Sequence, residues 1–205
     1  MISLARSERT ELCDLMLDLG PDAPTVPDGW KVRDLAAHLV VRERDAWAAP
    51  GIVLGGPFKT MLEAAMQRRR RQGLEDLVDT IRTGPPRWWK YLPAGAQLSE
   101  YYIHHEDVRR ANDHQPRTED RDLDEGLARL LTAMAPRVLR TVESGVDLIW
   151  EGRVLYRHGS EPRAILDGPP GELLLYLTGR RQIAEVEIGG DETARDVLEN
   201  TDLTL

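Results

Sequence analysis

The chain has 205 residues, a formal net charge of −8 and one cysteine. Its length suffices for one medium-sized domain or two small ones with a buried core, and its negative charge argues against a nucleic-acid-binding surface, because phosphate binding depends on a positive field. One cysteine excludes an internal disulfide. The first residues lack the apolar core of a signal peptide, and no apolar run reaches the ~18 residues of a membrane span. We therefore expect a cytoplasmic protein with no membrane partner.

Apolar residues recur at helical spacing in residues 3–19, which predicts an amphipathic helix that ends at Gly20. Cys13 lies within this helix. We expect it to be a packing residue, because no neighbouring feature would lower the pKa of its thiol.

A second helix is predicted from residue 32 to about residue 47, after a proline-rich loop. His38 lies in its apolar half, where an imidazole must find a partner or incur a desolvation cost. Taken alone, His38 is typical of a core histidine with a hydrogen-bond partner.

Residues 48–57 predict a connection rich in proline and glycine, and residues 58–83 predict a helix that is broken at Gly73. Four consecutive arginines lie at 68–71. On a helix they would point around most of the circumference, so they cannot form one tight basic patch, and we interpret them as a solvated helix end.

The next predicted helix covers residues 98–111 and contains the sequence EYYIHHEDVRR. Glu100 and His104 are four residues apart, so their side chains emerge about 40° apart on one helical face. A carboxylate and an imidazole that converge in this way are a ligand pair for a divalent metal such as zinc. The rest of the chain must supply a further ligand.

Residues 123–142 predict another amphipathic helix, so an antiparallel helical bundle is the economical arrangement for residues 1–144. From residue 145 onward the pattern changes to short β-type runs. A hairpin at 146–157, strands at 164–166 and 183–188, and a short buried helix at 172–177 are predicted. The fold class is therefore mainly α, with a bundle followed by a small α+β C-terminal region at 145–205.

Facing helices of a bundle can bring His38 close to Glu100 and His104. Three ligands of this kind leave at least one coordination position for water or substrate, and the ion could then activate water or a thiol, or polarise a carbonyl. Asp34 lies one turn before His38, and His105 follows His104. Either is an alternative ligand or a hydrogen-bond partner of a ligand.

Four segments resemble a known family: residues 3–9 (SLARSER), 30–39 (WKVRDLAAHL), 100–111 (EYYIHHEDVRRA) and 168–180 (GPPGELLLYLTGR). They are similar to an actinobacterial family of metal-binding proteins in the DinB/YfiT-like superfamily. That family is similar to the N-terminal domain of mycothiol-dependent maleylpyruvate isomerase, and the resemblance covers nearly the whole chain.

The resemblance implies a DinB-like antiparallel four-helix bundle whose metal ligands fall on His38, Glu100 and His104. It also implies that relatives use the thiol mycothiol in isomerase or S-transferase chemistry. An arginine of the C-terminal region takes part in the isomerase's site, and Arg180 is the candidate for it here.

We interpret the chain as a divalent-metal-dependent, thiol-using transferase or isomerase that acts on a small electrophile, with zinc as the expected metal and mycothiol as the cosubstrate. Arg180 or Arg109 would hold an anionic substrate group. Two alternatives remain open: a metal- or ligand-binding module without turnover, and a buried hydrogen-bonded network without metal. A homodimer is an open option for the quaternary structure.

Overall fold

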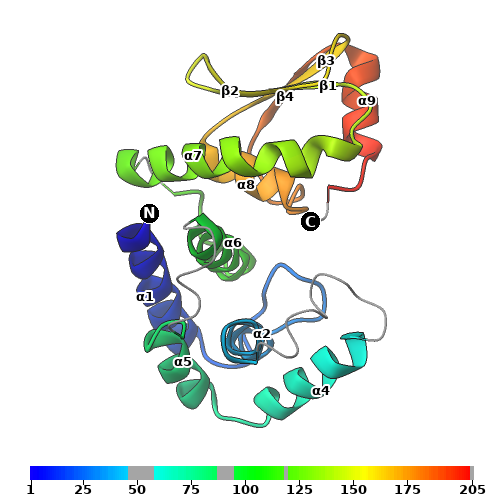
Figure 1. Cartoon of the computed structure of the whole chain (residues 1–205). Coiled ribbons are helices and arrows are strands. Elements are labelled where there is room, and N and C mark those ends of the chain that lie inside the picture. Colours follow the sequence, from blue (N-terminus) through cyan, green and yellow to red (C-terminus); the bar gives the residue numbers. More distant parts are fainter. Residues whose placement is uncertain (46–57, 87–94, 118–119, 204–205) are drawn as a thin grey trace. The chain divides into compact units, whose positions relative to one another are not determined.

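The computed structural model describes residues 1–45, 58–86, 95–117 and 120–203 (Figure 1). The chain forms two compact units, Met1–Gln115 and Pro116–Leu205. The first unit is helical, and the second combines helices with a four-stranded sheet. A mainly helical chain with a small α+β region near its C-terminus is therefore confirmed. The connection expected at 48–57 lies outside the described residues.

The helices of the first unit are α1 (Ile2–Leu19), α2 (Val32–Arg44), α4 (Phe58–Arg70), α5 (Leu74–Arg82) and α6 (Gly95–Ala111). Helix α1 packs against α5 and α6, and α2 packs against α4 and α5. The predicted helices of this region are thus confirmed, and the predicted break separates α4 from α5. The helices share an apolar core, whose fully buried members include Leu12, Met16, Leu35, Leu39, Leu77 and Ile81.

Helix α1 contributes Cys13 to this core and ends at a glycine. The side chain of Cys13 is fully buried, and burial raises the pKa of its thiol to about 12, so the thiol stays protonated and packs as expected. Gly20 follows the last turn with a φ of 84°. Glycine adopts this left-handed conformation without the steric cost that a Cβ would bring.

Hydrogen bonds connect the loop between α1 and α2 to α6 and to the start of α2. The backbone N–H of Val26 donates to the carbonyl of Asp107 in α6 over 3.0 Å. The N–H of Lys31 donates to Oδ2 of Asp34 over 3.0 Å, which satisfies one of the donors that a helix start leaves open. These bonds fix where α2 begins, and therefore where His38 lies.

The arginine run at the end of α4 is largely exposed, as expected, since Arg68, Arg70 and Arg71 are exposed, but it also makes ion pairs that the sequence did not predict. Arg69 approaches both carboxylate oxygens of Asp45 at 3.0 Å, and Arg68 reaches the same carboxylate at 2.9 Å. Arg70 pairs with Asp34 at 2.7 Å. Asp45 follows the last residue of α2 and is buried. The run therefore joins α4 to α2, because fork-shaped guanidinium groups match the geometry of a carboxylate.

The second unit contains a sheet of strands β1 (Gly145–Trp150), β2 (Arg153–His158), β3 (Arg163–Asp167) and β4 (Glu187–Gly190) in the order β2-β1-β3-β4. Strands β1 and β2 form the predicted antiparallel hairpin. Strands β1 and β3 are parallel, and β4 pairs antiparallel with β3. No helix in the described residues is long and apolar enough to cross a membrane.

Helices α7 (Arg121–Val138), α8 (Pro170–Leu177) and α9 (Glu192–Asn200) belong to the same unit. Helix α7 packs against α8 and β2, so it groups with the sheet, whereas the sequence placed it in the bundle that ends at residue 144. Two further differences concern the end of the chain. The predicted strand at 183–188 begins only at β4, because the N–H groups of Ile183 and Ala184 donate to the carbonyl of Arg180 in a turn, and α9 goes beyond the predicted elements.

Candidate metal centre

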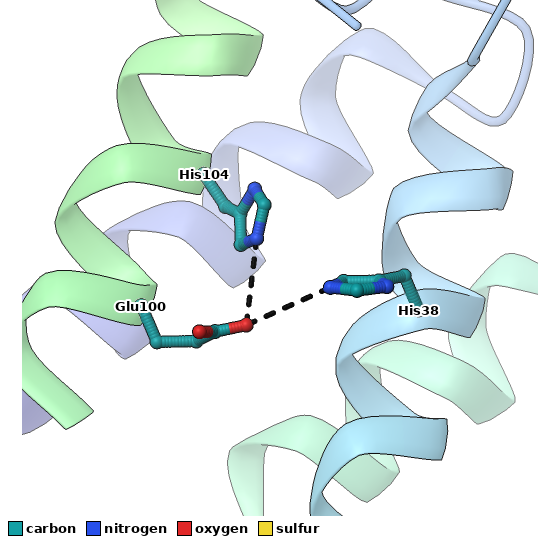
Figure 2. Close-up of side chains that lie close together, drawn as sticks. All are labelled: His38, Glu100 and His104. Atoms are coloured by element: carbon teal, nitrogen blue, oxygen red, sulfur yellow. Dashed lines mark ion pairs between the residues drawn. The ribbon is translucent and has the colours of Figure 1, made fainter. Parts of the chain in front are cut away.

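The structure brings together the three residues that the sequence proposed as metal ligands (Figure 2). His38 projects from α2, while Glu100 and His104 project from α6 with their spacing of four residues. One nitrogen of each imidazole and one carboxylate oxygen lie within 4.8 Å of one another. Oε1 of Glu100 is 3.4 Å from Nε2 of His104 and 3.7 Å from Nε2 of His38. The three atoms therefore face one common point.

The contact between α2 and α6 that creates this arrangement is reinforced beside it. The hydroxyl of Tyr101, which follows Glu100 in α6, donates to Oε1 of Glu43 in α2. Both side chains are buried. A buried charge-assisted hydrogen bond of this kind is among the stronger ones in proteins, so the pair holds His38 in place opposite the two candidate ligands of α6.

The site is buried, and one of its oxygen atoms lacks a hydrogen bond. The side chains of His38, Glu100 and His104 are 13%, 9% and 11% exposed. Oε1 of Glu100 is buried and has no hydrogen-bond partner among the described residues, since the contacts to the imidazoles are longer or poorly aligned. Nearly all buried polar atoms are hydrogen-bonded. A cation between the three side chains would satisfy this oxygen, so the donor set fits a divalent metal ion.

A buried aspartate orients one of the imidazoles. Nδ1 of His104 lies 2.9 Å from Oδ2 of Asp107, one turn further along α6. Asp107 is fully buried. When Nδ1 carries the proton and donates it to the carboxylate, the lone pair of Nε2 points toward Glu100. Carboxylate–histidine pairs of this kind fix the tautomer and raise the basicity of metal-binding imidazoles.

An arginine occupies the second oxygen of the central carboxylate. Nε of Arg42 lies 2.7 Å from Oε2 of Glu100. Arg42 follows His38 by one turn of α2, so both side chains reach the same carboxylate from the same helix. The two oxygens of Glu100 thus have different surroundings: Oε2 faces the guanidinium and Oε1 faces the two imidazoles.

The surroundings shift the pKa values of all three side chains. Burial lowers the pKa of His38 from its ordinary value, although Glu100 opposes the effect. Burial by itself would raise the pKa of Glu100, but His104, His38 and Arg42 outweigh it and hold this pKa well below the usual range. Burial also disfavours charge on His104, yet Asp107 and Glu100 prevail and raise its pKa to about 9. A metal ion would therefore have to displace a proton from His104.

Aromatic rings enclose the site on the side of α2. The ring of Trp30, just before α2, lies 5.3 Å from the ring of His38 with an angle of 59° between the planes. The rings of His38 and His104 are 5.2 Å apart in an edge-to-face arrangement. Edge-to-face pairs at this separation are favourable, so these contacts limit the rotation of His38.

The two alternative ligands have other partners. Asp34 pairs with Arg70 and with the start of α2. Nδ1 of His105 lies 3.1 Å from Oε2 of Glu8 in α1, and both residues are buried. His105, Glu8 and the exposed Glu11 form a second group whose ligand atoms also lie within 4.8 Å of one another. Within the described residues, neither Asp34 nor His105 belongs to the group of His38, Glu100 and His104.

The sequence did not assign the parts played by Asp107 and Arg42. The spacing of three residues between His104 and Asp107 is the signal for their contact on a helix. The part played by Arg42 has a weaker signal in the sequence. Its spacing of four residues from His38 was the available signal, but only the position of α6 shows which carboxylate it reaches.

The two arginines proposed for substrate binding have hydrogen-bond partners within their own units. Arg109 donates to Oε1 of Glu106 over 2.7 Å and to the carbonyl of Gln115 over 3.2 Å. Arg180 belongs to the second unit, where it donates to the carbonyl of Thr178 over 2.7 Å. Their roles in a site stay predictions.

Comparisons with known proteins identify the fold. No protein-family model and no curated protein sequence matches the chain. Among solved structures, the mycothiol-dependent maleylpyruvate isomerase and a histidine-to-alanine variant of it are similar, each with 16% sequence identity and a TM-score of 0.55. The match covers 93% of this chain and 92% of the other. The chain therefore shares the overall fold of that isomerase, which agrees with the resemblance of its sequence motifs.

Proposed function

We propose that the protein is a divalent-metal-dependent enzyme that uses a low-molecular-weight thiol in transferase or isomerase chemistry on a small electrophile. The observation that carries this proposal is the convergence of His38, Glu100 and His104 on one buried point, with Oε1 of Glu100 lacking a hydrogen bond. The likeness to a mycothiol-dependent isomerase supports mycothiol as the thiol. The first unit would then be a DinB-like four-helix bundle, acting in the cytoplasm.

The three side chains would hold the ion through Nε2 of His38, Oε1 of Glu100 and Nε2 of His104. Zinc suits this combination of two imidazoles and one carboxylate, and three protein ligands leave a position for a small molecule. A bound zinc ion stabilises a thiolate or polarises a carbonyl at neutral pH.

The remaining residues of the site would support this chemistry. Asp107 would keep the proton on Nδ1 of His104, so Nε2 is the nitrogen that an ion would bind when it displaces the second proton. The side chains of His38, Glu100 and His104 are largely buried, which strengthens electrostatic interactions between them. An arginine would hold an anionic group of the substrate, and Arg180 and Arg109 are the candidates from the sequence.

Metal analysis tests the first part of the proposal. The protein is purified without added chelator, and metal per chain is measured for the wild type, His38→Ala and His104→Ala. We expect about one zinc per chain in the wild type and a loss in both variants. His114→Ala is the matched control, because His114 is exposed in the segment after α6. Full metal content in both ligand variants would contradict the assignment.

Thiol consumption tests the second part. The metal-loaded protein is incubated with mycothiol and a panel of small electrophiles, and the loss of free thiol is followed. Turnover that is lost in His104→Ala but kept in His114→Ala supports an enzyme. A metal-loaded protein that consumes no thiol with any electrophile would instead support the alternative, a metal- or ligand-binding module without turnover.

A further inference from the structure

The geometry points to Arg42 as the residue that binds a carboxylate group on a ligand held at the His38, Glu100 and His104 site. The inference rests on the proposed metal site and adds to it a specificity for anionic ligands. Arg42 would then take the place that the sequence offered to Arg109 or Arg180.

Arg42 is a charged neighbour of the central carboxylate of the candidate site. Its Nε lies 2.7 Å from Oε2 of Glu100, and the other oxygen of that carboxylate faces both imidazoles. One carboxylate group therefore separates the guanidinium from the point of convergence. A small ligand that occupies an open position there would have Arg42 beside it.

Most of the hydrogen-bonding capacity of Arg42 is not used by the described part of the chain. A guanidinium has five N–H donors in a fixed planar fork. Nε faces Glu100, whereas neither Nη group has a partner among the described residues. The side chain is 34% exposed. The two Nη groups are therefore available for a further partner within the described residues, in the geometry that binds both oxygens of a carboxylate.

Other arginines near α6 differ from Arg42 in this respect. Arg109 uses its two Nη groups on Glu106 and on a backbone carbonyl, and Nε of Arg110 faces the same buried glutamate at 2.8 Å. These arginines satisfy a buried charge inside the protein. Arg42 contacts a buried charge through Nε, and its two Nη groups have no partner among the described residues, which is the arrangement expected of a residue that meets a ligand.

A purely structural role for Arg42 makes a different prediction. If Arg42 only orients Glu100, its replacement would weaken metal binding and would affect charged and neutral ligands equally. If Arg42 binds the ligand, its replacement would selectively weaken ligands that carry a carboxylate. The ratio of the dissociation constants of two matched ligands separates the two roles.

The experiment uses 3-mercaptopropionate and its neutral analogue 3-mercaptopropanamide as probes. Both present the same thiol to the cobalt(II)-loaded protein, and binding is followed through the absorption that a thiolate gives on cobalt. Cobalt per chain is measured in every sample. Because hydrogen bonds between charged groups contribute about 1.5–3 kcal/mol, we expect Arg42→Gln to lower the preference for the carboxylate probe about tenfold or more, with little change for the amide.

Arg33→Gln is the matched control, since Arg33 lies on the same helix with a partly exposed side chain near Asp22. This variant should leave the preference for the carboxylate probe over the amide probe unchanged. If Arg42→Gln loses cobalt, Arg42→Lys is measured in its place, because lysine keeps the positive charge but lacks the planar fork of N–H donors. A fall of about threefold or more in the preference for the carboxylate probe is then expected.

An unchanged preference in a cobalt-loaded Arg42 variant would overturn the role of Arg42 while leaving the metal site intact. A wild-type protein that takes up no cobalt would overturn the metal site, and this inference with it. The two failures are therefore distinguishable from the same set of samples.

Discussion

Nδ1 of His104 lies 2.9 Å from Oδ2 of the fully buried Asp107, one turn further along α6. This pair connects the local geometry of one helix to the chemistry of the candidate site. It determines which nitrogen of His104 faces Glu100, and it supplies a negative charge behind the imidazole.

The pair predicts that Asp107→Asn weakens metal binding without removing a ligand. Loss of such supporting carboxylates typically lowers metal affinity about 10- to 100-fold, because the asparagine no longer stabilises charge on the imidazole. The measurement is a competition titration for zinc against a chelator of known affinity. Asp113→Asn is the control, since Asp113 is exposed just after α6, and equal affinities in the two variants would contradict the role of Asp107.

Metal affinity should rise with pH between pH 6.5 and about 9. In the metal-free protein, Asp107 and Glu100 outweigh burial and raise the pKa of His104 from 6.5 to about 9, so the ion competes with a proton throughout this range. Zinc uptake in weakly buffered solution should release that proton. An affinity that is constant over this range would show that His104 is not a ligand.

The stability of the metal-free protein should respond to pH in the opposite direction. The folded-state pKa of His104 lies above its unfolded value, so the stabilisation is complete below pH 6.5 and is lost as pH rises through about 9. Denaturant unfolding of metal-free wild type and His104→Gln at several pH values measures this. The contribution of His104 is the part of the pH dependence of stability that the variant lacks. Identical stability profiles of the wild type and the variant would contradict this prediction.

His105 should matter for stability and not for metal content. Its Nδ1 lies 3.1 Å from Glu8, which links α6 to α1 in the interior. Removing one partner leaves the other charge buried, so we expect His105→Gln to lower the free energy of unfolding by about 1–3 kcal/mol. Metal per chain should stay at the wild-type value. A loss of metal in His105→Gln equal to that in His104→Gln would reopen the choice between the two histidines.

The ion pairs that join α4 to Asp45 at the end of α2 should contribute to the stability of the first unit. Asp45 is buried and meets Arg68 and Arg69. Breaking a buried ion pair costs about 3–5 kcal/mol, but Arg68 is largely exposed to screening solvent, so about 2 kcal/mol is expected for Asp45→Asn. Denaturant unfolding is the measurement, with the exposed Glu75→Gln as control. Equal stabilities of Asp45→Asn and the control would mean that hydration replaces the ion pairs of Asp45 without loss.

The helices of the first unit were predictable because their apolar residues recur with the period of a helix. The same periodicity placed Glu100 and His104 on one face of α6. Periodicity could not exclude Asp34 and His105 as metal ligands. Their partners Arg70 and Glu8 are distant in sequence, and only packing brings each pair together. The candidate set of three came from helical spacing and from the resemblance of the sequence motifs together.

Other features depend on tertiary contacts that periodicity does not contain. Helix α7 has the amphipathic pattern of a bundle helix, but its apolar face packs on α8 and β2. The alternating residues before β4 resemble a strand, yet Arg180 accepts their first N–H groups in a turn. The arginines at 68–71 are largely exposed, as their pattern predicts, but their pairing with Asp45 depends on the position of α2.

The most direct test of the metal site is an anomalous difference map from crystals of the zinc-loaded protein, collected at the zinc absorption edge. The account predicts one peak within ~2.0–2.3 Å of Nε2 of His38, Oε1 of Glu100 and Nε2 of His104 together. A peak at Glu8, Glu11 and His105 instead, or no peak at the three proposed ligands in protein that carries one zinc per chain, would contradict it.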